Sequence, residues 1–214
     1  MKNVIIASNN PGKITEFEQL FADQKEISII GQQHLSVPDI QETGHTFVEN
    51  ALLKARNAAR CSGMPAIADD SGIVVDALNG APGIYSARFG GANTTDQNNY
   101  EKLLLAMDDV PADQRSAYYI CVIVFLRNPM DPSPLICQGI WRGEILAAPQ
   151  GDQGFGYDPV FYVPELQCSA AQLTKDQKNQ LSHRGQAIRE LIPQIKQALA
   201  PTAHTTVASS SCCH

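Results

Sequence analysis

The sequence predicts an α/β protein with a mixed β-sheet, and two observations lead to this fold class. Short apolar runs typical of strands alternate along the chain with segments that carry helix-capping signals. Helices between strands permit parallel pairing, whereas short strands that follow one another closely favour antiparallel hairpins. The 214 residues suffice for one well-buried domain, or for two small lobes that share a cleft.

The first elements are a strand, a helix and a second strand. Val4–Ala7 is apolar and predicts a buried strand, which ends in the polar turn Ser8–Asn10. Pro11 suits the first position of a helix that Asn10 would cap, so we expect a helix as far as Phe21. Ile27–Ile30 predicts the next strand.

A second helix and a hairpin follow. Thr46 and Glu49 have the spacing of a capping box, and the good helix formers of 51–60 continue from it. The short apolar runs at 66–68 and 73–75 flank the polar sequence Asp69–Gly72. Because Asp, Ser and Gly are common in turns, this pattern predicts two strands joined at 69–72.

The second half of the chain predicts a loop, a helix and a pair of long strands. Glycines and a proline make 80–91 a loop, and 95–107 has the composition of a helix. The runs 116–127 and 136–145 are rich in residues that favour strands. Three prolines lie in the intervening 128–134, so we expect the two runs to pair as neighbouring strands.

The chain is expected to end in helix and then in a tail. Thr174 and Gln177 open a helical stretch that is interrupted at 182–185 and resumes over 186–199. Residues 201–214 lack periodicity and are expected to be disordered. The predicted organisation is therefore one domain over 1–200 and a tail over 201–214.

Composition excludes several classes of partner. The net charge of −6 argues against a nucleic-acid polymer as a partner. The longest apolar run, 118–126, is half the length of a membrane-spanning helix, and 4–7 is too short for the core of a signal peptide. The six cysteines form no C-x-x-C pair, so we expect reduced, mostly buried thiols and a cytoplasmic protein without a membrane partner.

The turn Ser8–Lys13 is the first candidate binding segment. A strand that leads into a capped helix start presents free N–H groups and the positive end of the helix dipole, which suits a phosphate. Lys13 adds a positive charge. The segment is not a Walker A loop, because Ile14 stands where Ser or Thr would follow and Ala7 where a glycine would precede. A well-capped helix with an exposed lysine is the other interpretation.

An acidic group forms the second candidate. Adjacent carboxylates at Asp69 and Asp70 either face water or hold a cation. Mg²⁺ takes one or two carboxylates together with phosphate oxygens and waters, so Glu42 and Asp70 would suffice as protein ligands. The alternative is that Asp69–Gly72 is an ordinary polar turn.

Three weaker signals complete the candidates. Asn50 and Lys54 are four residues apart and share a helix face that could meet a phosphate chain, or be merely solvated. Glycines around Phe155 would let a base stack on its ring, although a lone Phe is more often a core residue. His183 lies beside a cation in the helix break and could contact a base or cap the helix end.

Taken together and in order, these segments resemble the inosine/xanthosine triphosphate pyrophosphatase family, the non-standard purine NTP pyrophosphatases. The resemblance spans roughly the first 200 residues. The matching residues are Ser8-Asn9-Asn10-x-Gly12-Lys13, Glu42-Thr43-Gly44-x-Thr46-Phe47-x-Glu49-Asn50-Ala51, Lys54-Ala55, Ala68-Asp69-Asp70-Ser71-Gly72, Gly80-Ala81-Pro82-Gly83-Ile84-Tyr85-Ser86-Ala87-Arg88, Gly154-Phe155-Gly156-Tyr157-Asp158-Pro159 and Ser182-His183-Arg184-Gly185.

The resemblance implies an elongated, two-lobed α/β domain with a central mixed sheet flanked by helices and an active-site cleft between the lobes. It implies a homodimer that uses Mg²⁺ to hydrolyse ITP, dITP and XTP to the monophosphate and pyrophosphate, which keeps these nucleotides out of DNA and RNA.

The same resemblance assigns residue roles. Asp70 is the expected proton acceptor, and Asp70 and Glu42 are the expected metal ligands. The expected substrate-binding residues are Ser8, Asn9, Asn10, Pro11, Gly12, Lys13, Lys54, Ser71, Phe155, Gly156, Tyr157, Asp158, Lys178, His183 and Arg184.

Two other functions stay open on the sequence. A nucleotide-binding module without catalysis would need the phosphate and base segments but not the acidic group. A related pyrophosphatase acting on modified pyrimidine triphosphates would share the motifs. A kinase is disfavoured, since Walker A and kinase loops are missing.

Overall fold

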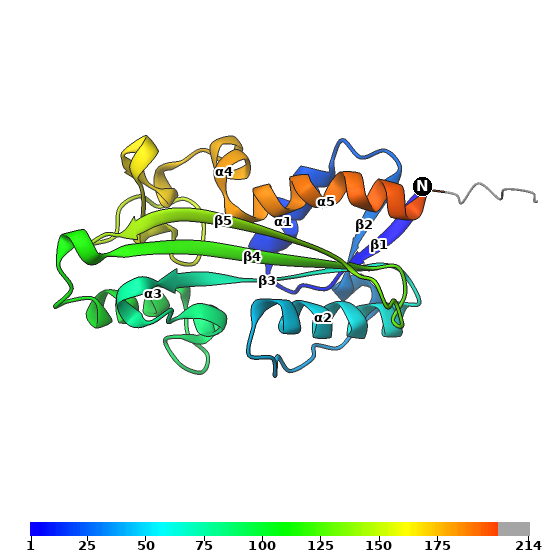
Figure 1. Ribbon diagram of the computed structural model, residues 1–214, viewed down its shortest axis with the longest axis horizontal. Coiled ribbons are helices and arrows are strands. Elements are labelled where there is room, and N and C mark those ends of the chain that lie inside the picture. Colours follow the sequence, from blue (N-terminus) through cyan, green and yellow to red (C-terminus); the bar gives the residue numbers. More distant parts are fainter. Residues whose placement is uncertain (201–214) are drawn as a thin grey trace, which may run out of the picture.

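The computed structural model describes residues 1–200 as an elongated α/β protein around one seven-stranded mixed sheet (Figure 1). This confirms the predicted fold class. The strands are β1 (Lys2–Ile6), β2 (Ile27–Gly31), β3 (Ala66–Val75), β4 (Ser116–Leu126), β5 (Leu135–Ile145), β6 (Phe161–Val163) and β7 (Cys168–Ser169). The α-helices are α1 (Pro11–Phe21), α2 (Phe47–Ser62), α3 (Asp96–Ala106), α4 (Lys175–Leu181) and α5 (His183–Leu199). The tail predicted at 201–214 lies outside the described residues.

The sheet has the order β2-β1-β3-β4-β5-β6-β7, and its two ends differ in pairing. Strand β1 is parallel to both β2 and β3, while β3 to β7 pair antiparallel. The long strands β3, β4 and β5 run along the molecule (Figure 1). Helices α1 and α5 cover one face of the sheet at the β1 end, α2 covers the opposite face, and α3 lies at the far end.

The apolar core is divided between the two ends of the sheet. At the β1 end, Phe17 and Ile188 pack on one face, and the alanine-rich α2 packs closely on the other. At the far end, Trp141 and Phe161 pack with α3. Between these cores the sheet carries polar side chains. The division leaves room for a cleft in the middle of the molecule.

The predicted capping signals are present. The Asn10 side chain accepts a hydrogen bond from the Lys13 backbone N–H at 3.1 Å, which caps α1. Thr46 and Glu49 form the expected capping box of α2. That helix ends at Gly63, whose left-handed φ of 68° favours glycine. Caps therefore fix where the two helices next to the cleft begin.

The hairpin predicted around residues 69–72 is wrong. Ala66–Val75 is one unbroken strand, paired residue for residue with β4. The polar residues stay extended because β4 provides a partner for each position and because buried cations neutralise Asp69. Gly72 is needed in this strand since a Cβ there would clash with the Gly83 carbonyl. The acidic pair is thus held on a rigid strand rather than in a turn.

Other details of the structure differ from the sequence-based expectations. The last helix begins at His183, not at residue 186, because Ser182 ends α4 and its side chain caps α5. The expected loop 80–91 contains a 3₁₀ helix, η3 (Gly83–Arg88). Strands β6 and β7 were not predicted, since runs of three and two residues carry no pattern. Of the cysteines in residues 1–200, all four are free and only Cys121 and Cys137 are buried.

No helix within residues 1–200 is both long enough and apolar enough to cross a membrane.

Candidate functional site

The cleft opens where strand β1 stops and β3 continues. Strand β1 pairs with β3 only through Ile5 and Ile6, so the edge of β3 has no strand beside it from Ala68 onward. Further along, η3 covers this edge, and the Ser86 hydroxyl accepts a hydrogen bond from the Ile73 N–H at 2.9 Å. Asp69, Asp70 and Ser71 lie in the gap between β1 and η3. The site therefore lies where β1 ends and leaves part of β3 without a neighbouring strand on that side.

A first cavity of about 580 Å³ occupies this gap. Its lining combines the turn before α1, side chains of α2, the middle of β3 and the end of η3; the charged or amide groups include Asn10, Lys13, Glu42, Lys54, Asp70 and Arg88. Three cations and the start of a helix make it suitable for an anion. Asp39, Glu42 and Asp70 contribute three carboxylates to the same lining.

Asp69 and Asp70 point to opposite faces of the sheet, as neighbours in a strand must. Asp69 is buried, and its Oδ2 lies 2.9 Å from Lys13 Nζ and 3.2 Å from Arg184 Nη2. Burial opposes ionisation of Asp69, but the charges of Lys13 and Arg184 hold its pKa far below the ordinary value. Asp69 is therefore a charged anchor for the two cations at neutral pH.

Asp70 has a different environment. Its Oδ1 lies 3.1 Å from Lys54 Nζ, and its Oδ2 accepts a hydrogen bond from Asn50 Nδ2 at 3.2 Å. Burial raises the pKa of Asp70, and the nearby charge of Glu42 adds to this effect, although Lys54 opposes it. Asp70 is therefore a carboxylate with an unusually high proton affinity.

Lys54 connects Asp70 to Glu42. Its Nζ donates to Glu42 Oε1 at 2.7 Å as well as to Asp70. Burial disfavours the ammonium, but the charges of Asp70, Asp69 and Glu42 raise the pKa of Lys54. For Glu42, burial is likewise outweighed by Lys54, which lowers its pKa. The two carboxylates are thus held around one cation.

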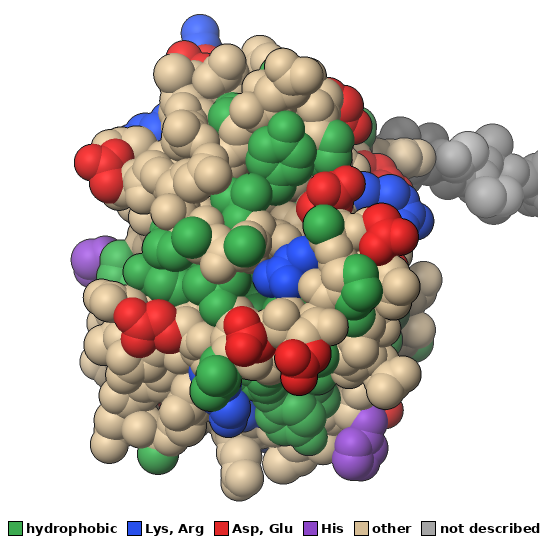
Figure 2. All heavy atoms as spheres, turned by 90° about the vertical axis from the view of Figure 1, so that its left-hand side faces the viewer, with side chains coloured by type: hydrophobic (Ala, Val, Ile, Leu, Met, Phe, Trp, Pro, Cys, Tyr) green, Lys and Arg blue, Asp and Glu red, His purple; other side chains and the backbone are tan. Residues whose placement is uncertain are grey.

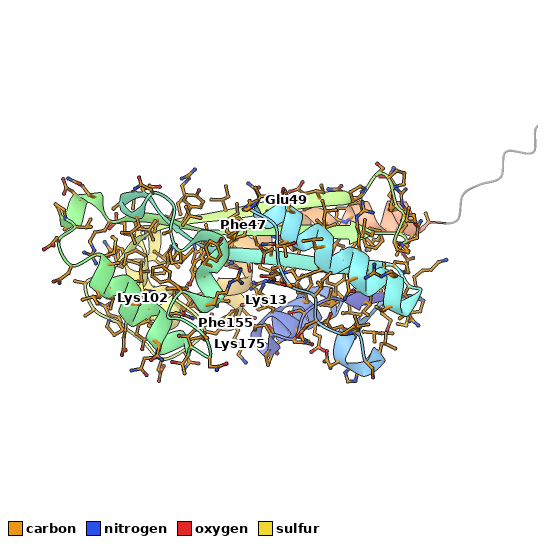
Figure 3. All side chains as sticks on the ribbon, turned by 90° about the horizontal axis from the view of Figure 1, so that it is seen from below. Lys13, Phe47, Glu49, Lys102, Phe155 and Lys175 are labelled. Carbon is orange, nitrogen blue, oxygen red and sulfur yellow. The ribbon has the colours of Figure 1, made fainter. Side chains whose placement is uncertain are left out.

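A second, narrower cavity of about 90 Å³ lies beside the first. It is lined by the Phe155–Asp158 loop and by side chains of β4, α4 and α5. Lys178 Nζ lies 2.5 Å from Asp158 Oδ2 and 4.4 Å from the centre of the Phe155 ring. In Figure 3, Phe155 and Lys13 lie near one another in the middle of the molecule. An aromatic wall and fixed donors suit a planar heterocycle.

His183 forms another wall of the second cavity. Its ring stacks on Tyr119 with the centroids 4.7 Å apart and the planes 5° from parallel. Burial and the charges of Arg184 and Lys178 lower the pKa of His183 well below its usual value, so the imidazole is neutral. Its Nδ1 has no hydrogen-bond partner within residues 1–200. The ring therefore lines the cavity as a neutral, buried imidazole with an unused nitrogen.

Arg184 lines the second cavity and contacts Ser71, which lines both cavities. Its Nη2 donates to Ser71 Oγ at 2.9 Å and to Asp69, and its Nη1 pairs with Glu16 of α1. Glu16 also lies 3.4 Å from Lys178 Nζ. Asn10, Lys13 and Ser71 line both cavities. A single ligand could therefore extend from one cavity into the other.

Most of the residues expected from the sequence meet here. The first cavity contains Ser8, Asn9, Asn10, Lys13, Glu42, Lys54, Asp70 and Ser71, and the second contains Asn10, Lys13, Ser71, Phe155, Gly156, Tyr157, Asp158, Lys178, His183 and Arg184. Pro11 and Gly12 do not line either cavity and instead face a hollow behind Phe155. Gly12 still matters, because a Cβ there would lie 2.9 Å from the Phe155 ring.

Sequence reasoning missed several residues of this site. Glu16 lies one helical turn after Lys13, and that spacing was a usable signal. Tyr119 lies in the strongly apolar β4, so nothing local marked it. Arg88 was matched only as part of a motif, without a role. Each contributes through a contact that joins distant segments.

Glu42 and Asp70 fit a divalent metal ion of the magnesium type. Both contact Lys54 Nζ and line the first cavity, so their oxygens lie close together. No group of three or more His, Cys, Asp or Glu side chains within residues 1–200 could hold a metal by itself. An ion here would need further oxygen ligands from phosphates and water, which is how Mg²⁺ is usually bound.

Fold and site together define a class: an α/β protein whose cleft pairs a cavity lined by cations and carboxylates with an aromatic one. More particularly, the chain belongs to the Ham1 family, whose model matches residues 4–194. The chain is 54% identical over 198 residues to the "dITP/XTP pyrophosphatase" of Photorhabdus laumondii, covering 92% of this chain and 100% of that one. It is 51% identical to the protein of the same name from Vibrio cholerae, covering 92% and 98%.

Solved structures agree with this assignment. The HAM1 protein of Coxiella burnetii superimposes with a TM-score of 0.86 at 49% identity, covering 92% of this chain and all of that one. The Ham1 protein of Staphylococcus aureus gives a TM-score of 0.81 at 44% identity, with the same coverage.

Proposed function

We propose that this protein hydrolyses non-standard purine nucleoside triphosphates, namely ITP, dITP and XTP, to the nucleoside monophosphate and pyrophosphate. This activity would keep such nucleotides out of DNA and RNA. The main supporting observation is the pair of joined cavities, one lined by three cations and three carboxylates and one aromatic, which share Asn10, Lys13 and Ser71. The names of relatives that are about half identical over nearly the whole chain support the same substrates.

The triphosphate would occupy the first cavity. The N–H groups at the start of α1 and the side chain of Lys13 would bind phosphate oxygens, and Lys54 would assist from α2. Ser8, Asn9 and Asn10 would form the turn around the phosphates, while Pro11 and Gly12 shape the backbone of that turn. Asp69 would keep Lys13 directed into the cleft, since the two groups are 2.9 Å apart.

Glu42 and Asp70 would hold Mg²⁺ between them. When bound, the ion supplies charge neutralisation for the phosphates and the leaving pyrophosphate. The contacts of Lys54 with both carboxylates keep them on the same side of the cavity. Asn50 further fixes Asp70, because its amide donates to Asp70 and accepts from the Gly44 N–H at 2.8 Å.

Asp70 is the proposed proton acceptor. A water would attack the α-phosphorus, the bond from that phosphorus to the bridging oxygen would break, and the proton of the water would pass to Asp70. The position of Asp70 favours this role, since its carboxylate lines the cavity that would hold the phosphates and is held there by Lys54 and Asn50. In the alternative, Asp70 only positions the metal and the water.

The purine would occupy the second cavity. Phe155 would stack on the base, and Lys178, His183 and Arg184 would surround its edge with Tyr157 and Asp158. A 6-oxo group accepts hydrogen bonds, whereas the 6-amino group of adenine would leave buried donors unpaired. Sites that depend on such a match reject the wrong partner by about 10⁴-fold. GTP carries the same 6-oxo group as ITP and differs from ITP only by the amino group at position 2 of the base.

We further propose that the protein is a cytoplasmic homodimer whose partners are small nucleotides rather than nucleic-acid polymers or membranes. The end of the molecule seen in Figure 2 carries acidic and basic side chains scattered among apolar ones, without a continuous basic surface. A net charge of −6 supports the same preference.

Phosphorus NMR of reactions with Mg²⁺ tests the function. We expect ITP, dITP and XTP to give pyrophosphate and monophosphate, GTP and ATP to react much more slowly, and Asp70→Asn to serve as the inactive control. Release of orthophosphate would contradict the proposal. Binding of ITP without turnover would favour a nucleotide-binding module, and preference for a modified pyrimidine triphosphate would favour the related pyrophosphatases.

A further inference from the structure

Arg88 stands at the edge of the first cavity, at the end of η3. Its Nη1 donates to Glu42 Oε2 at 3.3 Å, and its guanidinium lies 5.1 Å from the centre of the Tyr85 ring. Tyr85 is 54% exposed and is among the large apolar residues that the core does not bury. This exposed ring serves as a platform that holds Arg88 over the cavity.

The other cations of this cavity are already committed. Lys13 is paired with the buried Asp69, and Lys54 is paired with both Glu42 and Asp70. The Arg88 side chain is 43% exposed and makes one hydrogen bond within residues 1–200. A guanidinium has five N–H donors. Arg88 is therefore a cation at this cavity with donors to spare.

The backbone at Arg88 is fixed, whereas its guanidinium uses only part of its hydrogen-bonding capacity. Ser86 accepts from the Ile73 N–H, and its carbonyl accepts a hydrogen bond from the Tyr157 hydroxyl at 2.7 Å. These contacts anchor η3 to β3 and to the loop of the second cavity. An anchored backbone with a half-exposed guanidinium that has donors to spare is suited to bind a ligand oxygen rather than to stabilise the core.

We propose that Arg88 binds the pyrophosphate part of the triphosphate and stabilises it as it leaves; this inference rests on the proposed function. A phosphate oxygen would replace Glu42 as the acceptor of Arg88, which would leave Glu42 Oε2 available to the metal ion. When the bond to the α-phosphorus breaks, the electron pair stays on the pyrophosphate, and the guanidinium binds that added negative charge.

A purely structural role makes a different prediction. If Arg88 only joins η3 to Glu42, its removal should lower stability and weaken every ligand to a similar extent. A pyrophosphate-binding role requires the loss to be confined to ligands that carry the β- and γ-phosphates. Inorganic pyrophosphate represents the β- and γ-phosphate end of the substrate, and IMP represents the nucleoside end. Neither is turned over in the proposed reaction.

Isothermal titration with inorganic pyrophosphate and with IMP, in excess Mg²⁺, is the test. For Arg88→Ala we expect pyrophosphate to bind about 10-fold to 100-fold more weakly, the range for a charge-assisted hydrogen bond, and IMP to change less than twofold. Arg88→Lys should recover part of the lost pyrophosphate affinity, because lysine keeps the positive charge but lacks the paired N–H donors of the guanidinium. The control is Arg142→Ala, which removes a similar guanidinium near Tyr118, 5.8 Å from its ring and away from the cavity.

Unchanged pyrophosphate affinity in Arg88→Ala, or equal weakening of pyrophosphate and IMP, would overturn the inference. Melting temperatures of all variants reveal any loss of folding. Hydrolysis of ITP by the unsubstituted protein is measured alongside. If that protein does not release pyrophosphate, the proposed function fails; if it does and Arg88→Ala binds pyrophosphate normally, only the role of Arg88 fails.

Discussion

Asp69 and Asp70 are adjacent in strand β3 but contact different lysines: Asp69 lies 2.9 Å from Lys13, and Asp70 lies 3.1 Å from Lys54. The alternation of a strand sends one carboxylate towards α1 and α5 and the other towards α2. Their pKa values move in opposite directions, down for Asp69 and up for Asp70. Asp69 is therefore suited to holding two cations in place, and Asp70 is suited to a role in catalysis.

Asp70→Asn should reduce ITP turnover by on the order of 10²-fold or more, the scale of a positioned acid–base group. It should not lower the melting temperature at neutral pH. A carboxyl whose folded-state pKa is raised stabilises the fold below its unfolded pKa and loses that contribution as the pH rises through the folded value. Steady-state kinetics and calorimetry check both parts; near-native turnover would rule out the role of Asp70.

Asp69→Asn should instead destabilise the fold by about 3–5 kcal/mol, because Lys13 and Arg184 would lose a buried partner. The lowered pKa of Asp69 gives stability that is present above the unfolded pKa, near 3.9, and is lost as the pH falls towards the folded value. Urea unfolding of Asp69→Asn and of the unsubstituted protein should show a difference in the free energy of unfolding. This difference should be constant above about pH 5 and shrink in acid. A constant difference at all pH values would contradict the ion-pair explanation.

His183 should remain neutral at physiological pH. Its pKa is lowered by burial and by two neighbouring cations, so its contribution to stability is present above the unfolded pKa, near 6.5, and is lost as the pH falls. Proton–nitrogen NMR of the ring should show no titration between pH 6 and 8. A His183 midpoint near 6.5 would show that the ring is accessible to water.

Phe155→Ala should raise the KM for ITP by about 10-fold or more, since stacking on a base contributes about 1–3 kcal/mol. Affinity for inorganic pyrophosphate should stay within twofold, because Phe155 lines the second cavity and not the first. Phe155→Tyr keeps the aromatic face and is the matched control. Equal weakening of both ligands would place the ring in a structural role.

Glu42→Gln should raise the Mg²⁺ concentration for half-maximal activity by on the order of 10-fold, the scale of a perturbed metal site. A chelator should abolish turnover, and added Mg²⁺ should restore it. Titration of Mg²⁺ into the protein, followed by calorimetry without nucleotide, gives a second measurement. The same Mg²⁺ requirement in Glu42→Gln and the unsubstituted protein would exclude Glu42 as a ligand.

Local signals in the sequence determined the elements that frame the cleft. Asn10 and Pro11 specify the start of α1, and Thr46 with Glu49 specifies the start of α2, because caps satisfy N–H groups within a few residues. The motif residues around Asp70, Phe155 and His183 likewise predicted where the polar and aromatic groups of the site lie along the chain.

Only the tertiary structure decided what those groups do. Residues 69–72 resemble a turn locally, but pairing with β4 holds them in a strand and thereby sends Asp69 and Asp70 to opposite faces. The roles of Glu16, Tyr119 and Arg88 depend on partners far along the chain. Capping and strand propensity act over a few residues and are visible in sequence, whereas burial and charge pairing depend on which distant segments the fold brings together.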